Sequence, residues 1–221
     1  MKDRLVWFNG RMPFAAQLVK AKTHLSANDP VLAGVIKIYG LVELKPHGNH
    51  YKQLLGSIIG QQLSVKVASS IRARVFDHFG GNPTPQQLLS ADSDALRGLG
   101  LSRAKVSYVK DLAEHIASKR LDMSQVSTLP DEELTQQLVA VKGLGQWSAQ
   151  MFMIFGLGRL NVLPVGDLGI RRAAMNLYSL RQLPDPETLS KLSKHGYWEP
   201  YNSVAALYLW KSLDNAPDLT G

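Results

Sequence analysis

The chain has 221 residues, with 25 Lys and Arg against 18 Asp and Glu, and it contains no cysteine. This length can bury a sizeable core, and a hydrophobic content of 45% excludes a disordered chain. The lack of cysteine excludes a disulfide scaffold, a cysteine-ligated zinc or iron–sulfur site and a thiol nucleophile.

The formal net charge of +7 is unevenly distributed along the chain. All of the excess lies in residues 1–120, whereas residues 121–221 carry 8 basic and 10 acidic groups. A basic balance is compatible with a polyanionic partner, but many proteins carry as much charge for solubility alone. Charge by itself therefore identifies no partner.

Neither end of the chain predicts a targeting segment. Residues 1–9 contain an acid and only a four-residue apolar run, which does not resemble a secretory signal peptide. The longest apolar stretches, residues 151–155 and 204–210, are far shorter than the ~20 residues that cross a bilayer. We expect an intracellular, soluble protein without a membrane partner.

Apolar residues recur at helical spacing through most of the chain. In chain order, these positions are Leu54, Leu55, Ile58 and Ile59; Ala68, Ile71, Val75 and Phe79; Val106, Val109, Leu112, Ala113 and Ile116; Leu134, Leu138 and Val141; and Trp147, Met151, Ile154 and Phe155. Residues 80–83, Gly-Gly-Asn-Pro, should end the second of these helices. Residues 127–133 predict a helix start with a hydroxyl or acidic cap and acids in the first turn. Only residues 5–8 hint at a strand, so we predict an all-α protein of roughly ten helices.

A Gly-Leu-Gly sequence occurs twice, each time between two apolar-periodic helices. Residues 96–100, Leu-Arg-Gly-Leu-Gly, are echoed 45 positions later by residues 141–145, Val-Lys-Gly-Leu-Gly. Glycines permit positive φ and close approach, and the unpaired amides that begin the next helix form a site for a phosphate oxygen. A short helix–helix turn without any ligand is the alternative.

The wider context of the second turn resembles a known family. Residues 138–149, LVAVKGLGQWSA, resemble the helix-hairpin-helix motif of DNA repair glycosylases. Residues 163–171, LPVGDLGIR, are similar to the Gly/Pro-rich loop and catalytic aspartate that name the HhH-GPD superfamily. Residues 51–64 match the helix and loop that approach the DNA minor groove in that family, and residues 197–210 look like its C-terminal helix. These four motifs, in the family's order over about residues 17–213, are most similar to the 3-methyladenine DNA glycosylase II (alkylbase) branch.

The resemblance implies an all-α helix-hairpin-helix (HhH-GPD) glycosylase fold of two helical lobes, with the active site in the cleft between them. Residues 1–221 would form a single unit, with no room for the extra N-terminal β domain of some members. The lobe that carries the hairpin is expected at about residues 50–160, and the other lobe at about residues 1–45 plus 165–221.

The implied function is a monofunctional DNA glycosylase that excises alkylated purines from duplex DNA by base flipping, as the first step of base excision repair. Typical substrates would be 3-methyladenine and 7-methylguanine. The partner would be duplex DNA that contains alkylated bases, and the protein is expected to act as a monomer. Its location would be cytoplasmic and nucleoid-associated, or nuclear in a eukaryote.

By position, Asp167 is the catalytic aspartate of the resemblance. Breaking an N-glycosidic bond develops oxocarbenium character on the sugar, which a carboxylate stabilises, or the carboxylate orients an attacking water. A single carboxylate suffices when the leaving base is already cationic, as an N3- or N7-alkylpurine is. The alternative from the residues alone is an N-cap for a helix that begins at Leu168.

The base pocket implied by the resemblance is formed by Trp147, Met151, Leu168 and Tyr201. Bifunctional relatives carry a lysine at the position of Trp147, and tryptophan cannot form the Schiff base that cuts the strand. The indole could instead stack on a cationic base, an interaction of roughly 0.5–2 kcal/mol, or it could lie in the core. Met151 stands where some members carry tyrosine, and Gly166 replaces an acid that often precedes the aspartate.

Gln62 occupies the position of the wedge that fills the gap left by a flipped nucleotide. Leu63 could share this role, and Ser64 completes the matching loop, so all three are assigned to DNA contact. A polar loop without a ligand is the alternative.

The hairpin itself is expected to bind phosphate through Gly143, Gly145 and Ser148. The resemblance further implies a structural monovalent cation, Na⁺ or K⁺, held by the backbone carbonyls of Val139, Val141 and Leu144, with no other cofactor. The six histidines show no metal-ligand spacing. The absence of cysteine excludes the iron–sulfur branch of the superfamily.

Two other functions stay open. One is a glycosylase for a different damaged base, such as deaminated adenine. The other is a protein that recognises distorted DNA without catalysis, which the departures at Gly166 and Met151 allow but the presence of Asp167 disfavours.

Overall fold

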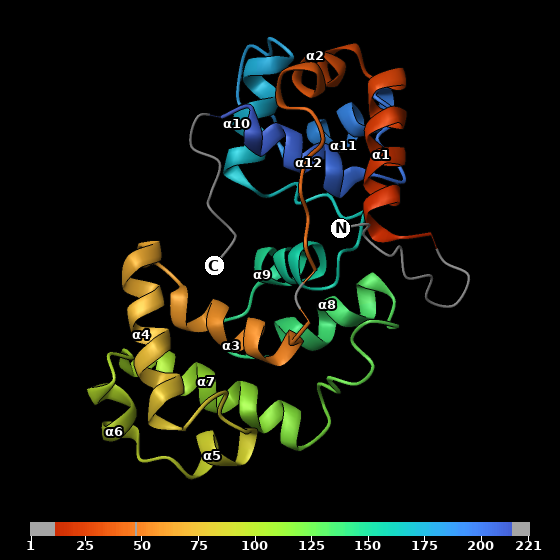
Figure 1. Ribbon diagram of the computed structural model, residues 1–221. Helices are drawn as coiled ribbons and strands as arrows, with labels where there is room; N and C mark the ends of the chain where they lie inside the picture. The colour runs from red at the N-terminus through yellow and green to blue at the C-terminus, as the bar shows by residue number, and fades with distance from the viewer. Residues whose placement is uncertain (1–11, 47, 214–221) are drawn as a thin grey trace, which may run out of the picture. The chain divides into compact units, whose positions relative to one another are not determined.

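The computed structural model describes residues 12–46 and 48–213 (Figure 1). Every regular element among these residues is helical, with twelve α-helices and one π-helical segment, η1. The prediction of an all-α protein is therefore confirmed, and the number of helices exceeds the predicted ten. The hint of a strand at residues 5–8 lies outside the described residues. Among the helices described, none has both the length and the apolar character needed to cross a membrane.

The chain divides into two compact units. Unit 1 combines Met1–Lys45 with Arg159–Pro217, and unit 2 is formed mainly by Pro46–Gly158. The helices of unit 1 are α1 (Phe14–Asn28), α2 (Pro30–Tyr39), α10 (Leu168–Leu177), α11 (Pro186–His195) and α12 (Asn202–Lys211). Those of unit 2 are α3 (His50–Gly60), α4 (Val65–His78), α5 (Pro85–Ser90), α6 (Ser93–Gly98), α7 (Arg103–Ala117), α8 (Asp131–Val139), α9 (Gln146–Met151) and η1 (Phe152–Gly156).

The core of unit 1 is built around α12, which is apolar on all sides and buried from Asn202 to Trp210. Helices α1, α2 and α10 all pack against it. A helix that is hydrophobic all round is typical of a protein interior, because no face of it suits water.

A buried carboxylate, Asp29, ties the two halves of unit 1 together. Its Oδ1 caps α2 by accepting hydrogen bonds from the amides of Val31 and Leu32, and its Oδ2 accepts 2.7 Å and 2.5 Å bonds from Trp198 Nε1 and Tyr178 Oη. Burial, together with Asp29, raises the pKa of the Tyr178 hydroxyl well above its ordinary value, so it stays a donor. The loop that leads into α12 is thereby fixed, because a buried charge with four donors is stable only in that arrangement.

In unit 2, α7 packs against α3, α5 and α6. The apolar positions predicted for α3 are all buried, as are most of those predicted for α4 and α7. Helix α4 ends at His78, and its C-cap, Phe79, directly precedes the predicted Gly-Gly terminator. Helix α8 differs from the prediction: it begins with three acids, but its N-cap is Pro130, with no side-chain cap. Proline has no side-chain oxygen to accept the first amides of the helix, and the three acids of the first turn favour the helix dipole instead.

Candidate active site and nucleic-acid interface

Asp167 lies at the end of the 163–167 loop in unit 1 and is half-buried. Its Oδ1 accepts a 2.8 Å hydrogen bond from the amide of Ile170, which makes it the N-cap of α10, as the capping alternative predicted. The same oxygen accepts a 3.0 Å hydrogen bond from Trp210 Nε1 on α12. Both of these hydrogen bonds are accepted by the same carboxylate oxygen.

Trp210 is a site residue that the sequence analysis missed as an individual position. It is only 4% exposed and stands 43 positions after Asp167, so no local spacing connects the two. Gly169 makes their approach possible, because a Cβ there would stand 3.1 Å from Asp167 Oδ1 and 3.3 Å from the Trp210 ring. The lack of a side chain at Gly169 therefore leaves room for the contact between Asp167 and Trp210.

Two predicted pocket residues lie in the same unit as Asp167. Leu168 follows it directly, and its side chain is 47% exposed. Tyr201 is half-buried at the start of α12, with its ring edge-on to His24 at 5.2 Å between centroids. Trp147 and Met151 lie on α9 in unit 2.

Trp147 is 50% exposed at the start of α9, which argues against its alternative role as a core residue. The buried residues of this segment are instead Ala149, Gln150 and most of η1. Met151 is half-buried at the point where the α-helix passes into the π-helical segment. Such π-segments frequently occur at functional sites, and the 3.6-residue period did not predict this one.

The predicted wedge loop, residues 61–64, connects α3 to α4. Gln62 is exposed and adopts a left-handed backbone conformation, with φ of 59°, which is uncommon for a residue other than glycine. Leu63 beside it is 36% exposed. Ser64 caps α4, because its hydroxyl accepts a 3.4 Å hydrogen bond from the amide of Val67. Strained, exposed backbone of this kind concentrates at functional sites.

The hairpin turn between α8 and α9 is likewise built on a left-handed residue, Gly143, with φ of 83°. A Cβ at this position would overlap the ring of Tyr108. Gly145 is the N-cap of α9 and supplies no side-chain acceptor, so the first amides of the helix, which include that of Ser148, receive no side-chain cap. An uncapped helix start suits a phosphate oxygen.

The earlier Gly-Leu-Gly sequence folds differently, although it too connects two helices, α6 and α7. Its left-handed residue is the second glycine, Gly100, with φ of 105°. Ser102 then caps α7 by accepting a hydrogen bond from the amide of Lys105. Because a hydroxyl already satisfies this helix start, the second turn is the better candidate for phosphate binding.

The three residues predicted to hold a cation surround the same hairpin turn. Val139 is the last residue of α8, whereas the side chains of Val141 and Leu144 are buried and anchor the turn. The carbonyl of Val141 accepts a 3.1 Å hydrogen bond from the amide of Leu144, which leaves its second lone pair. Neutral carbonyl oxygens are suitable ligands for Na⁺ or K⁺. Within residues 12–46 and 48–213, no group of three His, Asp or Glu side chains could hold another metal ion.

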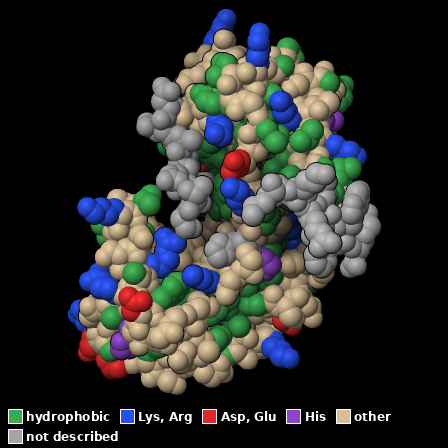
Figure 2. All heavy atoms as spheres, viewed as in Figure 1, with side chains coloured by type: hydrophobic (Ala, Val, Ile, Leu, Met, Phe, Trp, Pro, Cys, Tyr) green, Lys and Arg blue, Asp and Glu red, His purple; other side chains and the backbone are tan. Residues whose placement is uncertain are grey.

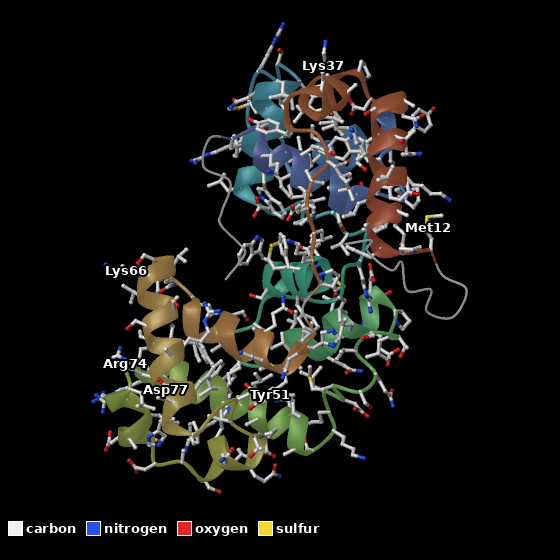
Figure 3. All side chains as sticks on the ribbon, viewed as in Figure 1. Met12, Lys37, Tyr51, Lys66, Arg74 and Asp77 are labelled. Atoms are coloured by element: carbon white, nitrogen blue, oxygen red, sulfur yellow. The ribbon has the colours of Figure 1, made fainter. Side chains whose placement is uncertain are left out.

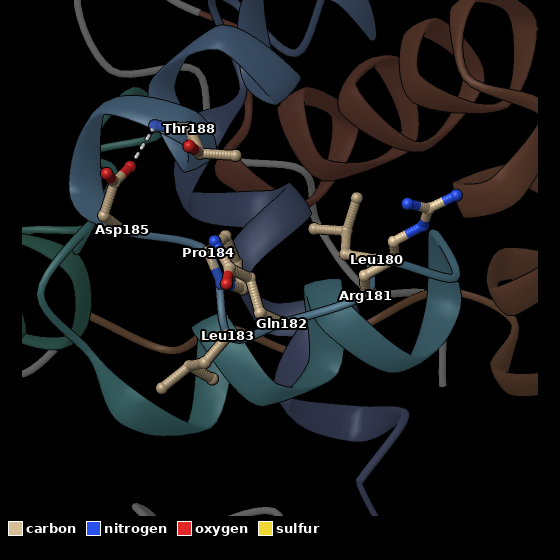
Figure 4. A pocket seen from close by; sticks show the side chains of 7 residues that line it. All are labelled: Leu180, Arg181, Gln182, Leu183, Pro184, Asp185 and Thr188. Carbon is tan, nitrogen blue, oxygen red and sulfur yellow. Dashed lines mark hydrogen bonds between the residues drawn. The ribbon is translucent and has the colours of Figure 1, made fainter.

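A concavity in unit 1 does not coincide with the predicted site. The loop of residues 180–185, together with Thr188, lines a volume of about 240 Å³ (Figure 4). Asp185 in this loop caps α11 through a 2.7 Å hydrogen bond from the amide of Thr188. We assign no function to this concavity.

Each unit brings together part of the predicted site. Unit 1 groups Asp167 and Leu168 with Trp210, and unit 2 joins the wedge loop to the hairpin through a hydrogen bond from Gln61 Nε2 to the Gly143 carbonyl, at 2.7 Å. Asp167 and Trp147 belong to different units, and their action on the same nucleotide stays a prediction.

Residues 55–198 match the family model of the HhH-GPD superfamily base excision DNA repair proteins. The chain belongs to this superfamily.

Among its curated relatives, the alkylbase DNA glycosidase-like protein mag2 of Schizosaccharomyces pombe is 31% identical over 87% of this chain and 92% of its own length. DNA-3-methyladenine glycosylase 1 of the same yeast is 32% identical over 88% of this chain and 87% of its own length. The crystal structure of a DNA-3-methyladenine glycosidase from Bacillus halodurans matches with a TM-score of 0.79 and 39% identity over 90% of both chains. The S. pombe 3-methyladenine DNA glycosylase Mag1, in complex with abasic DNA, matches with a TM-score of 0.73 and 32% identity over 87% of this chain and 95% of that one.

Proposed function

We propose that the protein is a monofunctional DNA glycosylase that hydrolyses the N-glycosidic bond of alkylated purines in duplex DNA. The observation that carries this proposal is the carboxylate of Asp167, fixed at the head of α10 by the Ile170 amide and Trp210 Nε1. The relatives named as 3-methyladenine glycosylases support the choice of substrate.

The chemistry requires only one carboxylate. An N3- or N7-alkylpurine carries a positive charge, so the glycosidic electron pair leaves with the base and neutralises it without a general acid. Asp167 stabilises the oxocarbenium character that develops at C1′, or orients the water that attacks it. The water oxygen forms the new bond to C1′, and its proton passes to the carboxylate or to solvent. The products are a free base and an abasic site.

The other site residues bind the substrate and select the damaged base. The exposed indole of Trp147 offers a face on which a cationic base stacks, and Leu168 and Tyr201 add apolar and aromatic surface. Gln62, with Leu63 beside it, is proposed to fill the gap in the stack. The amides of Gly145 and Ser148, at an uncapped helix start after Gly143, bind the phosphate backbone.

We further propose that a monovalent cation binds the hairpin turn as a structural group. The carbonyls of Val139, Val141 and Leu144 would hold it, and its charge would strengthen the attraction of the turn for phosphate. The protein itself would act as a monomer on duplex DNA, in a bacterial nucleoid or a eukaryotic nucleus.

The proposal is tested by incubating the protein with methylated duplex DNA and measuring the release of free bases by chromatography. Release of 3-methyladenine or 7-methylguanine is expected, and retention of both in the DNA would contradict the proposed activity. Release of hypoxanthine from a control duplex, without release of either alkylpurine, would instead favour the enzyme for deaminated adenine.

The lack of lyase activity has its own test, which is borohydride reduction during turnover. The indole of Trp147 cannot form an imine, so we expect no covalent adduct with DNA. A trapped adduct would show that another amine attacks C1′.

A further inference from the structure

Three side chains on one face of α7 contact both of the elements that are proposed to grip DNA. They are Lys105, Tyr108 and Asp111, spaced three residues apart, so they form a stripe along the helix. The stripe is buried or half-buried, although it consists of a cation, a phenol and an acid. We call it the α7 stripe.

Lys105 holds the wedge loop at its base. Its ammonium donates hydrogen bonds of 2.7 Å to the Ile59 carbonyl and 2.8 Å to the Gln61 carbonyl. These carbonyls lie at the C-terminal end of α3, where a positive charge is favourable for the helix dipole. Gln61 directly precedes the left-handed Gln62, so Lys105 fixes the backbone from which the wedge projects.

Asp111 and Tyr108 hold the hairpin turn. The Asp111 carboxylate accepts a 2.8 Å hydrogen bond from the amide of Lys142 and lies 3.4 Å from its ammonium. Burial alone would raise the pKa of Asp111, but the hydrogen bonds from Lys142 and the neighbouring His115 keep that pKa below its ordinary value. Tyr108 places its ring against Gly143, the next residue of the turn.

A direct link closes this network. The side chain of Gln61 leaves the wedge loop and donates a 2.7 Å hydrogen bond from Nε2 to the Gly143 carbonyl. The wedge loop and the hairpin turn are therefore joined twice, once through α7 and once through Gln61. All of these contacts lie within unit 2.

We propose that the α7 stripe and Gln61 form a brace that sets the spacing between the wedge loop and the hairpin turn, and that Lys105, Asp111 and Gln61 are positioning residues for base flipping. This inference rests on the proposed function, because flipping requires a wedge in the stack and a fixed phosphate contact on the same duplex. A displacement of about 1 Å between two such elements costs up to about 100-fold in function.

In this proposal, Lys105 does not bind a DNA phosphate, although it is a cation close to the proposed nucleic-acid interface. Two of its three donors are engaged by carbonyls, and the side chain is half-buried. Lys110 provides a matched control, since it lies on the same helix and donates a 2.6 Å hydrogen bond to the Ala91 carbonyl at the end of α5. Removing either lysine deletes one charge, together with two lysine–carbonyl contacts for Lys105 and one for Lys110, but only Lys105 reaches the wedge loop.

The test compares Lys105→Met with Lys110→Met on a duplex that carries a tetrahydrofuran abasic analogue with 2-aminopurine beside it. Fluorescence anisotropy gives the affinity and its salt dependence, and 2-aminopurine fluorescence reports whether the wedge enters the stack. We expect Lys105→Met to bind about tenfold more weakly and to lose most of the fluorescence change, with an unchanged salt slope, whereas Lys110→Met stays within about twofold of wild type. Equal losses in both variants, or a salt slope reduced by about 1 in Lys105→Met, would overturn the brace in favour of a general charge effect or a phosphate contact.

A second set of variants keeps the proposal open to refutation should Lys105→Met fail to fold. Gln61→Ala changes a half-exposed side chain and should weaken binding to the abasic duplex as Lys105→Met does. Asp111→Asn keeps an acceptor for the Lys142 amide and should retain more binding than Asp111→Ala. Wild-type affinity in Gln61→Ala would refute the brace, and so would equal losses in the two Asp111 variants.

The same probe separates failure of the brace from failure of the proposed function. It contains no glycosidic bond to cleave at the lesion, so binding is measured without catalysis. If the wild-type protein does not prefer the abasic duplex to an undamaged one, the proposed function and the brace both fail. If it does prefer it and the variants bind equally well, only the brace fails.

Discussion

At the residue scale, Asp167 combines an observed structural role with a proposed chemical one. The sequence offered an N-cap and a catalytic carboxylate as alternatives, and the cap is present, because the Ile170 amide donates to Oδ1. The Trp210 indole holds the same oxygen from α12. A carboxylate fixed at two points has little freedom left to lose when a substrate binds, which favours catalysis.

Asp167→Asn is expected to abolish excision and preserve the fold. The asparagine Oδ1 can still accept the hydrogen bonds from the Ile170 amide and Trp210 Nε1, and asparagine is as good an N-cap as aspartate. The negative charge that stabilises the transition state is lost, so the single-turnover rate on methylated duplex should fall by about 100-fold or more. Asp167→Ala is the comparison, since it should lose the same activity and also about 1 kcal/mol of stability. A wild-type rate in Asp167→Asn would show that another group performs the chemistry.

Trp210→Phe tests whether the indole N–H orients the carboxylate. Phenylalanine keeps an aromatic ring but is smaller than the indole, and a hydrogen bond to a charged group, with a typical value of about 1.5–3 kcal/mol, is removed. We expect the single-turnover rate to fall by about 10- to 100-fold. Trp198→Phe is a matched control, because Trp198 Nε1 donates to the Asp29 carboxylate in the same unit. Both variants should lose stability in urea unfolding, but only Trp210→Phe should lose much of the single-turnover rate. An equal loss of rate in both would show that Trp210 has a structural role alone.

At the element scale, helical periodicity predicted α3, α4 and α7 from apolar positions that the structure mostly buries. Leu54, Leu55, Ile58 and Ile59 are all buried on α3, because the 3.6-residue period reports directly which face meets a core. The cap of α8 and the π-helical segment η1 were not predictable in this way. The N-cap of α8 is a proline without a side-chain acceptor, and η1 departs from the 3.6-residue period on which the prediction relied.

The two Gly-Leu-Gly turns show what sequence repetition can and cannot predict. Both connect helices, as expected, but their left-handed residues differ, and only the first is followed by a serine cap. The pairing of Asp167 with Trp210 and the contacts of the α7 stripe were beyond prediction for a related reason. They join positions distant in the chain, and a single sequence carries no signal for such pairs.

Gly143→Ala is expected to disrupt the hairpin. Its φ of 83° costs an L-residue about 1–2 kcal/mol, and the added methyl group would overlap the ring of Tyr108. We expect weaker binding to the abasic duplex and a loss of stability of about 1–3 kcal/mol in urea unfolding. Gly145→Ala is the control, since its φ is −105° and nothing lies within 4 Å of a Cβ there. Its stability should change by less than about 1 kcal/mol, and equal destabilisation in the two variants would contradict the steric argument.

At the scale of the whole molecule, the structure shows where the basic side chains lie. The net charge of +7 is not concentrated at the hairpin, where Lys142 is the single basic residue of the 138–149 segment. Residues 61–120 carry 9 basic and 5 acidic groups, and Lys and Arg side chains gather over the α4 side of unit 2 (Figure 2). We therefore expect the hairpin to depend on backbone amides, and the exposed cations of α4 to supply the long-range attraction to DNA.

Lys66→Ala tests this division at the exposed start of α4, directly after the wedge loop (Figure 3). Its ammonium is exposed and forms no ion pair with a described residue, so it is available to a phosphate. Because each phosphate contact releases counterions, its removal should reduce the slope of log affinity against log salt concentration by about 1. Lys37→Ala, on α2 in unit 1, makes the same change in net charge and should leave the slope unchanged. Equal slopes in the two variants would mean that the charge acts only as a global field, because a direct contact at α4 would separate them.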